Sequence, residues 1–95
     1  MDVVGDVRAE ADLEAWLSYM EVRNPVAGQK VVELVLDEVD RIAELPLIGK
    51  AGLVFGTREK KVDGTPLKII YGVLDDTVHI LFIPHDRQKW PPEDK

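Results

Sequence analysis

Cysteine is absent from the 95-residue sequence, which excludes a disulfide, a thiolate nucleophile and a cysteine-based metal site. No apolar run approaches the roughly 18 residues that a membrane-spanning helix needs. The N-terminal segment is acidic and lacks the basic and apolar regions of a secretory signal. The sequence therefore predicts a cytoplasmic protein without membrane association.

Positive charge is also scarce, because 12 lysine and arginine residues stand against 18 aspartate and glutamate residues, giving a net charge of −6. The imbalance lies in residues 1–50, where eleven acids stand against five bases, whereas residues 51–95 have seven of each. Nucleic-acid binding by the whole surface is excluded, since phosphate contacts require clustered cations. The second half still predicts a local basic patch, formed by Arg58, Lys60, Lys61, Lys68, Arg87 and Lys89.

The first half of the sequence has the pattern of two helices in one globular domain, with 45% hydrophobic and 32% charged residues overall. Apolar residues recur at helical spacing in the first helix: Leu13, Trp16, Leu17 and Met20. Asp6 is the expected N-cap of this helix. Asn24-Pro25 is the expected start of the second helix, and Pro46 is its expected end. We predict an antiparallel helical hairpin over about residues 7–45.

The second half has the pattern of a short β-meander. Two segments rich in β-branched and aromatic residues, 67–73 and 78–83, lie between turn signals. Strand alternation assigns the better core face of the first segment to Leu67, Ile69, Tyr71 and Val73. The opposite face of that segment contains Lys68, Ile70 and Gly72.

These elements together predict an α+β fold. Two N-terminal antiparallel helices are expected to pack on a small twisted antiparallel sheet of three to four strands. The sheet is expected over about residues 54–84, and Val3 with Val4 is a candidate for one further short strand. Residues 85–95 are expected to form a polar tail, with Trp90 packed back onto the domain.

Seven short motifs occur in order along the sequence. They are Ala11-Asp12-Leu13 with Trp16 and Tyr19, Arg23-Asn24-Pro25, Leu45-Pro46-x-Ile48-Gly49, Gly56-Thr57-Arg58-Glu59, Gly64-Thr65-Pro66, Ile69-Ile70-Tyr71-x-Val73 and His85-x-Arg87-Gln88-x-Trp90-Pro91. In this order and spacing, the sequence resembles toxins of the RelE/ParE superfamily from bacterial and archaeal type II toxin–antitoxin modules. The resemblance covers nearly the whole chain.

The resemblance implies a growth-inhibiting toxin and a cognate antitoxin that wraps it through a disordered or helical segment. A homodimer and a heterotetramer with the antitoxin both fit this expectation. The superfamily has two branches: RelE-like toxins cut mRNA in the ribosomal A site, and ParE-like toxins poison DNA gyrase without catalysis of their own. The sequence favours the first branch slightly, so that the expected target is ribosome-bound mRNA and the alternative target is gyrase.

RNA cleavage without a metal needs a base for the 2′-hydroxyl, a cation for the charged phosphorane and an acid for the leaving oxygen. His85 is the candidate acid or base, and Arg58 is the candidate phosphate-binding cation. Lys68 stands where some RNA-cleaving relatives have a catalytic arginine. Further candidates for contact with RNA are Lys60, Lys61, Arg87 and Gln88. No metal ion or cofactor is implied.

Each catalytic candidate also has a structural interpretation. The alternatives are a tail-anchoring role for His85, an ion pair with a helix for Arg58 and a solvated strand position for Lys68.

Three positions depart from the pattern of RNA-cleaving relatives. Gly72 follows the strand tyrosine where many relatives have arginine, and Phe82 stands where many have a polar residue or arginine. Pro84 replaces the usual leucine or valine before the final motif. These differences suggest that Ile70, Phe82 and Pro84 form an exposed antitoxin-binding patch. A degenerate toxin that only binds its antitoxin is therefore a third interpretation.

Overall fold

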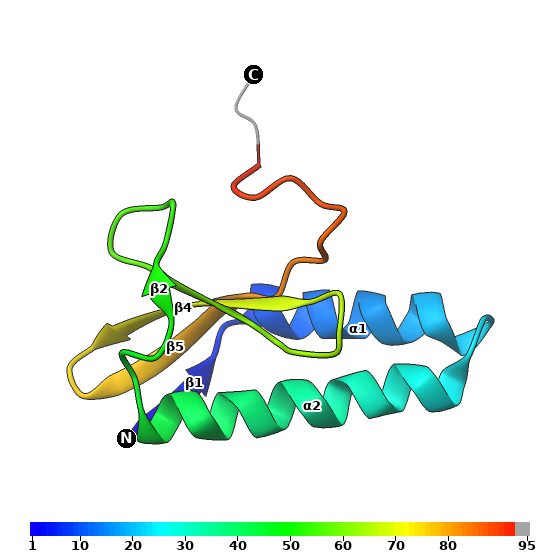
Figure 1. Ribbon diagram of the computed structural model, residues 1–95, viewed down its shortest axis with the longest axis horizontal. Helices are drawn as coiled ribbons and strands as arrows, with labels where there is room; N and C mark the ends of the chain where they lie inside the picture. Colours follow the sequence, from blue (N-terminus) through cyan, green and yellow to red (C-terminus); the bar gives the residue numbers. More distant parts are fainter. Residues whose placement is uncertain (93–95) are drawn as a thin grey trace.

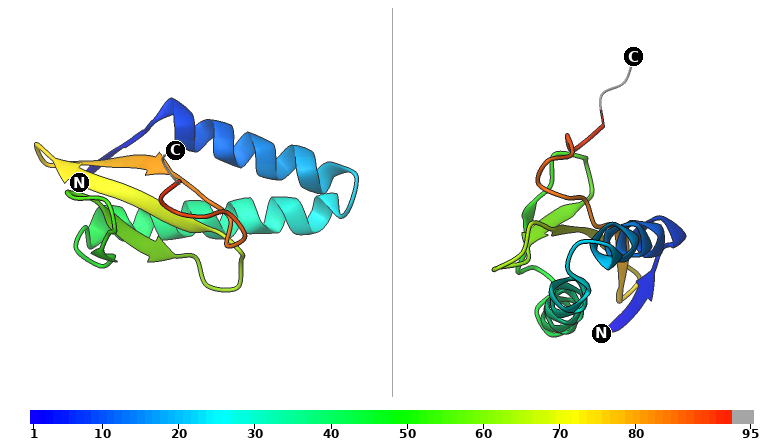
Figure 2. Two further views of the ribbon diagram at one scale, coloured as in Figure 1. Left: turned by 90° about the horizontal axis from the view of Figure 1, so that it is seen from above. Right: turned by 90° about the vertical axis from the view of Figure 1, so that its right-hand side faces the viewer.

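A computed structural model describes residues 1–92 of the chain. In chain order the elements are β1 (Asp2–Gly5), α1 (Val7–Glu21), α2 (Pro25–Glu44), β2 (Lys50–Ala51), β3 (Arg58–Lys61), β4 (Lys68–Leu74) and β5 (Thr77–Phe82). The two helices run side by side in opposite directions (Figures 1 and 2). This is the α+β arrangement that the sequence predicts.

Local caps define both helices. The Asp6 carboxylate accepts a hydrogen bond from the Arg8 N–H at 2.8 Å and caps α1. The Asn24 side chain accepts from the Ala27 N–H at 3.1 Å and caps α2, in which Pro25 is the first residue. The second helix ends at Glu44, before Pro46, as predicted.

The helices approach closely at one glycine. A Cβ atom on Gly28 would lie 2.7 Å from the Met20 Cβ, a separation that real side chains do not tolerate. The same backbone position accepts a hydrogen bond from the Trp16 indole N–H at 3.2 Å. Glycine at this position therefore lets α1 and α2 pack against each other and fixes the orientation of the indole.

The sheet is mixed and has five strands in the order β1-β5-β4-β3-β2. Strands β2 to β5 pair antiparallel with their neighbours, but β1 pairs parallel with β5. The Asp6 N–H donates to the Ile80 carbonyl at 2.8 Å and extends that parallel pairing. The prediction of three to four antiparallel strands therefore misses one parallel edge pair and the two-residue β2.

The core lies between the helices and one face of the sheet. It contains Trp16 of α1, Val35 and Ile42 of α2, and Ile69, Tyr71, Val78 and Ile80 of β4 and β5. Val73, which strand alternation assigns to the same face, is 39% exposed. It precedes the β4–β5 turn, where Asp75 and Asp76 adopt positive φ angles of 52° and 59°.

The other face of the sheet is covered by the chain's own tail. The Trp90 ring packs on Phe82 with a centroid separation of 4.8 Å, and the Arg8 guanidinium lies 4.5 Å from the Phe82 centroid. Ile70, which pairs with Phe82, is fully buried, and Pro84 is also buried. The predicted exposure of Ile70 and Pro84 is therefore wrong, and Phe82 is only partly accessible, because the tail returns over β5.

Candidate functional site

A cavity of about 690 Å³ lies beside α1, where that helix meets the start of β4 and the segment after β5. Its lining residues are Asp12, Ala15, Trp16, Tyr19, Pro66, Leu67, Ile83, His85, Asp86, Arg87 and Gln88. The Asp12 carboxylate accepts a hydrogen bond from the Ile83 N–H at 2.8 Å, which holds the end of β5 against α1. Three of the sequence-predicted site residues therefore line one wall: His85, Arg87 and Gln88.

The imidazole of His85 is oriented by its own segment. A backbone bridge to Leu67 places His85 beside β4, and its ring lies 5.9 Å from the Trp16 ring. The Arg87 N–H donates to His85 Nδ1 at 3.0 Å. Because Nδ1 is an acceptor, the neutral ring has its proton on Nε2. In this tautomer the second ring nitrogen, Nε2, is a hydrogen-bond donor and Nδ1 is already occupied by the Arg87 N–H.

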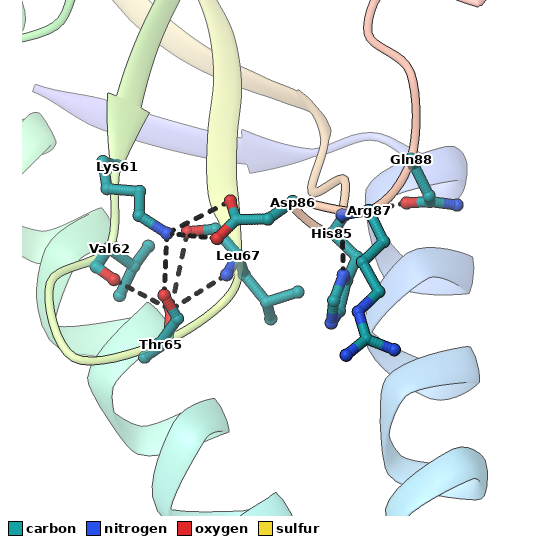
Figure 3. Close-up of polar contacts among 8 residues, drawn as sticks. All are labelled: Lys61, Val62, Thr65, Leu67, His85, Asp86, Arg87 and Gln88. Carbon is teal, nitrogen blue, oxygen red and sulfur yellow. Dashed lines mark hydrogen bonds and ion pairs between the residues drawn. The ribbon is translucent and has the colours of Figure 1, made fainter.

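The neighbours of His85 are held by polar contacts at the surface. The His85 N–H donates to the Gln88 side-chain oxygen at 2.8 Å. Lys61 Nζ lies 2.9 Å from the Asp86 carboxylate and donates to the Thr65 carbonyl at 2.8 Å (Figure 3). The His85 ring and the Arg87 side chain extend in the same direction in that view. The side chain of Lys61, a candidate for contact with RNA, thus binds the C-terminal segment through Asp86.

Arg58 belongs to the opposite end of β3. Its guanidinium Nη1 donates to the Gly49 carbonyl at 2.8 Å and lies 3.5 Å from the Leu47 carbonyl. Arg58 pairs in register with Tyr71, four residues along β4 from the position that bridges to His85. At about 3.4 Å per residue, this is a separation of about 14 Å along the strand. The structure does not bring Arg58 and His85 together.

Tyr71 makes further hydrogen bonds to the same connection that Arg58 contacts. Its buried hydroxyl donates to the Pro46 carbonyl at 2.8 Å and accepts from the Gly49 N–H at 2.8 Å. A Cβ on Gly49 would lie 2.7 Å from that hydroxyl oxygen, so only glycine fits there. Arg58 and Tyr71 together hold the connection between α2 and β2.

Lys68 is engaged with a buried carboxylate. Its Nζ lies 2.9 Å from Glu59 Oε1, and Glu59 Oε2 accepts from the Leu53 N–H at 3.0 Å. Glu59 is 4% exposed. Burial raises the pKa of Glu59, but the hydrogen bonds from the Leu53 N–H and Lys68, with the charge of Lys50, outweigh it and lower the pKa below its ordinary value. Lys68 therefore neutralises an internal acid.

Lys60 points toward the helices instead. Its Nζ donates to the Lys61 carbonyl at 3.1 Å and lies 3.9 Å from the Glu38 carboxylate of α2. Neighbours along a strand point to opposite faces, so Lys60 and Lys61 diverge. The predicted basic patch is thus divided over two faces and two ends of the sheet.

Two features of the described surface were missed by sequence reasoning about the site. Asp12, Trp16 and Tyr19 form a cavity wall, and their helical spacing of i, i+4 and i+7 is a signal that could have located it. The exposed segment Leu53–Phe55 was given no role in a site, and its last two residues, which fall within the sheet predicted over about residues 54–84, lie in the loop between β2 and β3. Within residues 1–92, no three histidine, aspartate or glutamate side chains gather in a way that could hold a metal ion. Over the same residues, neither helix is long and apolar enough to cross a bilayer.

Comparison with known protein families identifies the chain. Residues 5–90 match the family described as the ParE toxin of the type II toxin–antitoxin system parDE. The chain belongs to this ParE toxin family. The match extends from the end of β1 to Trp90 and confirms the superfamily that the sequence motifs predict.

Relatives of this ParE-family toxin come from several bacteria. The putative toxin Y4kP of Sinorhizobium fredii is 35% identical over 85 residues, covering 90% of this chain and 88% of that protein. Toxin RelE2 of Caulobacter vibrioides is 36% identical over 83 residues, covering 87% of this chain and 92% of that protein. A structure from the chromosomal ParDE system of P. aeruginosa matches with a TM-score of 0.78 at 23% identity, covering 90% of this chain and 95% of that chain, which supports the fold.

The ParE-family protein is therefore a toxin of a type II toxin–antitoxin system. Membership implies a cognate antitoxin as its partner. The matching family is named for ParE and one relative is named RelE2, so family membership alone does not decide the cellular target.

Proposed function

We propose that this toxin arrests growth in the manner of the ParE branch, by binding DNA gyrase without catalysis of its own. The observation that supports this proposal is the separation of the three catalytic candidates. His85 lies in the cavity beside α1, Arg58 fastens the α2–β2 connection, and Lys68 neutralises Glu59.

An RNA-cleaving site needs its acid, base and cation around one phosphate. In this protein the positions that pair with Arg58 and His85 are about 14 Å apart along the chain of β4, and Lys68 is paired with a buried acid. The departures at Gly72 and Phe82 remove an arginine and a polar residue or arginine that many RNA-cleaving relatives have. A toxin that acts by binding needs none of these groups.

The test is a supercoiling assay with purified gyrase. Wild-type toxin should block supercoiling, and added antitoxin should restore it. The His85→Gln variant should inhibit gyrase within about twofold of wild type, because His85 is not required for a binding mechanism. In a translating extract the toxin should leave the transcript intact. Unaffected supercoiling, together with a cleaved transcript, would overturn the proposal.

Ribosome-dependent mRNA cleavage is the second candidate, and one observation favours it. His85 and Arg87 line the same cavity as Trp16 and Tyr19, so a donor, a cation and two rings for base stacking occur together. If this cavity cleaves RNA, His85→Gln should lower the cleavage rate by about 10²-fold or more. Primer extension on the extract's mRNA measures that rate, and full cleavage by His85→Gln would exclude the histidine from the chemistry.

A further inference from the structure

We propose that the loop between β2 and β3 is the surface with which this toxin docks on its target, and we call Leu53, Val54 and Phe55 the apolar knob. The partner is a folded protein with an apolar cleft and an acidic rim. This proposal rests on the proposed function, from which it takes a protein as the target. It adds the surface of the toxin that makes the contact and the chemistry of the partner.

The apolar knob is exposed to an unusual degree. Phe55 is fully exposed, Leu53 is 74% exposed and Val54 is 40% exposed. The loop extends from the sheet on the side away from α2 (Figures 1 and 2). Three consecutive apolar residues at the tip of such a loop contribute nothing to the core of the described protein. Aromatic side chains that enter a partner's pocket are frequent energetic centres of interfaces.

The knob is also held in one conformation. The Gly52 N–H donates to the Thr57 carbonyl at 2.8 Å, and the Thr57 hydroxyl donates to the Val54 carbonyl at 2.7 Å. The Leu53 N–H donates to the buried Glu59 carboxylate at 3.0 Å. Gly56 adopts a φ of +83°, which completes the turn. A loop that is already ordered loses little conformational entropy when it binds.

The charge around the base of the loop differs from that of the rest of the chain. Lys50 precedes the loop, Arg58 follows it, and Lys68 lies beneath it against Glu59. Lys68 and Glu59 neutralise each other, so the charge that remains at this base is that of Lys50 and Arg58, which is positive although the chain has a net charge of −6. A complementary cleft therefore has acidic groups at its rim.

The same charge argues against a symmetric dimer through the knob. In a two-fold interface the same surface faces itself, so Lys50 and Arg58 of one copy would meet those of the other. A convex aromatic tip also needs a preformed hollow, which a folded protein supplies. These observations favour the target over a second copy of the chain.

The experiment compares Phe55→Ser and Leu53→Ser with Val26→Ser, a matched control. Val26 is an apolar residue of α2 that is 80% exposed and lies outside the loop. Growth arrest without antitoxin, affinity for purified gyrase, affinity for the antitoxin and circular dichroism are measured for each variant. Phe55→Ser should weaken gyrase binding about 30-fold or more and abolish growth arrest. Antitoxin affinity and the spectrum should stay unchanged, and Val26→Ser should match wild type throughout.

Other outcomes overturn the inference in distinguishable ways. Unchanged growth arrest by a folded Phe55→Ser variant would exclude the knob from target contact. Loss of antitoxin binding with retained toxicity would assign the knob to the antitoxin. Loss of a wild-type dimer would assign it to self-association. If wild type does not inhibit gyrase but Phe55→Ser still abolishes growth arrest, the knob stands and the proposed function fails.

Charge reversal at Lys50 tests the acidic rim separately. Lys50→Glu should slow association with the target about 10-fold at low salt and leave dissociation unchanged, because rim charges act mainly on the encounter rate. Lys50→Gln should slow association less than Lys50→Glu. Salt at about 0.5 M should reduce both effects, because the Debye length is then about 4 Å. Faster association of Lys50→Glu would show that the rim is basic.

Discussion

Two segments extend from the sheet on the side away from α2, and they are fastened by different kinds of contact (Figure 1). The first is the β2–β3 loop: the chain that leads to it from α2 is held by the buried Tyr71 hydroxyl, and the Leu53 N–H of the loop itself donates to the buried Glu59 carboxylate. The C-terminal segment is held by Lys61 and Asp86, whose side chains are 47% and 50% exposed. Because water competes poorly for buried hydrogen bonds, the first segment is the more rigid.

This difference matches the roles that we propose for the two segments. A loop that inserts into a partner's cleft benefits from being ordered before it binds. The C-terminal segment contacts Phe82 through the Trp90 ring, and it is joined to the domain by the exposed Lys61–Asp86 pair and by the bond from the Asp86 N–H to the Pro66 carbonyl at 2.7 Å. An exposed ion pair of this kind contributes little to stability. Substitutions that remove either the buried contacts of the first segment or the exposed pair of the second test whether the two segments differ in this way.

The largest loss should follow Lys68→Met. This change leaves the Glu59 carboxylate buried with only the Leu53 N–H as a partner. Breaking one side of a buried ion pair should lower the free energy of unfolding by about 3 kcal/mol. Urea denaturation measures it, and the double variant Glu59→Gln/Lys68→Met should recover part of the loss. If the free energy of unfolding falls by less than about 1 kcal/mol, the pair of Lys68 and Glu59 does not hold the loop at Leu53.

A smaller loss is expected for Tyr71→Phe, which removes the hydroxyl between the Pro46 carbonyl and the Gly49 N–H. Leaving these two groups without their partner should cost about 2 kcal/mol. Thermal and urea unfolding measure the change. Tyr19→Phe is the control, because Tyr19 is 48% exposed. Equal effects of the two variants would contradict the assigned role of Tyr71.

The pH dependence of stability should report on Glu59. Its pKa in the folded protein lies below the ordinary 4.5. The unfolded chain therefore binds the proton more readily, and the stabilisation is complete above the ordinary pKa and lost as pH falls through the lowered one. Wild type should lose stability relative to Glu59→Gln as pH falls below the ordinary pKa of 4.5 and through the lowered one. Asp6, with a pKa lowered to about 2 by Arg8, is present in both proteins and cancels.

The smallest effect is expected at the tail. Asp86→Asn removes the charge of an exposed ion pair with Lys61, and such pairs contribute less than about 1 kcal/mol. The decrease in the free energy of unfolding, measured by urea denaturation, should disappear in about 0.5 M sodium chloride, because salt screens exposed charges. A loss as large as that of Lys68→Met would remove the contrast between the two segments.

The sequence predicts the helices well because their ends depend on local groups. The Asp6 cap, the Asn24 cap and Pro46 act within a few residues of the backbone that they terminate. The pairing of Val3 and Val4 with β5 depends instead on residues more than seventy positions away. No local pattern specifies such a partner or its direction, and β2 is too short to show any alternation.

The site was predicted only where a motif was contiguous. His85, Arg87 and Gln88 lie in one motif, and the structure places all three on the same cavity wall. Arg58 and Lys68 belong to different strands, and only their partners in the fold show that Arg58 holds the α2–β2 connection and Lys68 pairs with Glu59. The apolar residues from Leu53 to Phe55 resemble the start of a strand, so their exposure could not be read from the sequence.

The parallel pairing of β1 with β5 determines at which point during synthesis the fold can be completed. Residues 2–5 have no partner until residues 77–80 have been synthesised, although both helices can form earlier from contacts near in sequence. The bond from the Ile83 N–H to Asp12 also closes only at that stage. A nascent chain therefore displays an open strand before it becomes a growth-arresting protein. We expect a protease-sensitive interval during synthesis, which pulse-labelling would time and which would give the antitoxin its first opportunity for capture.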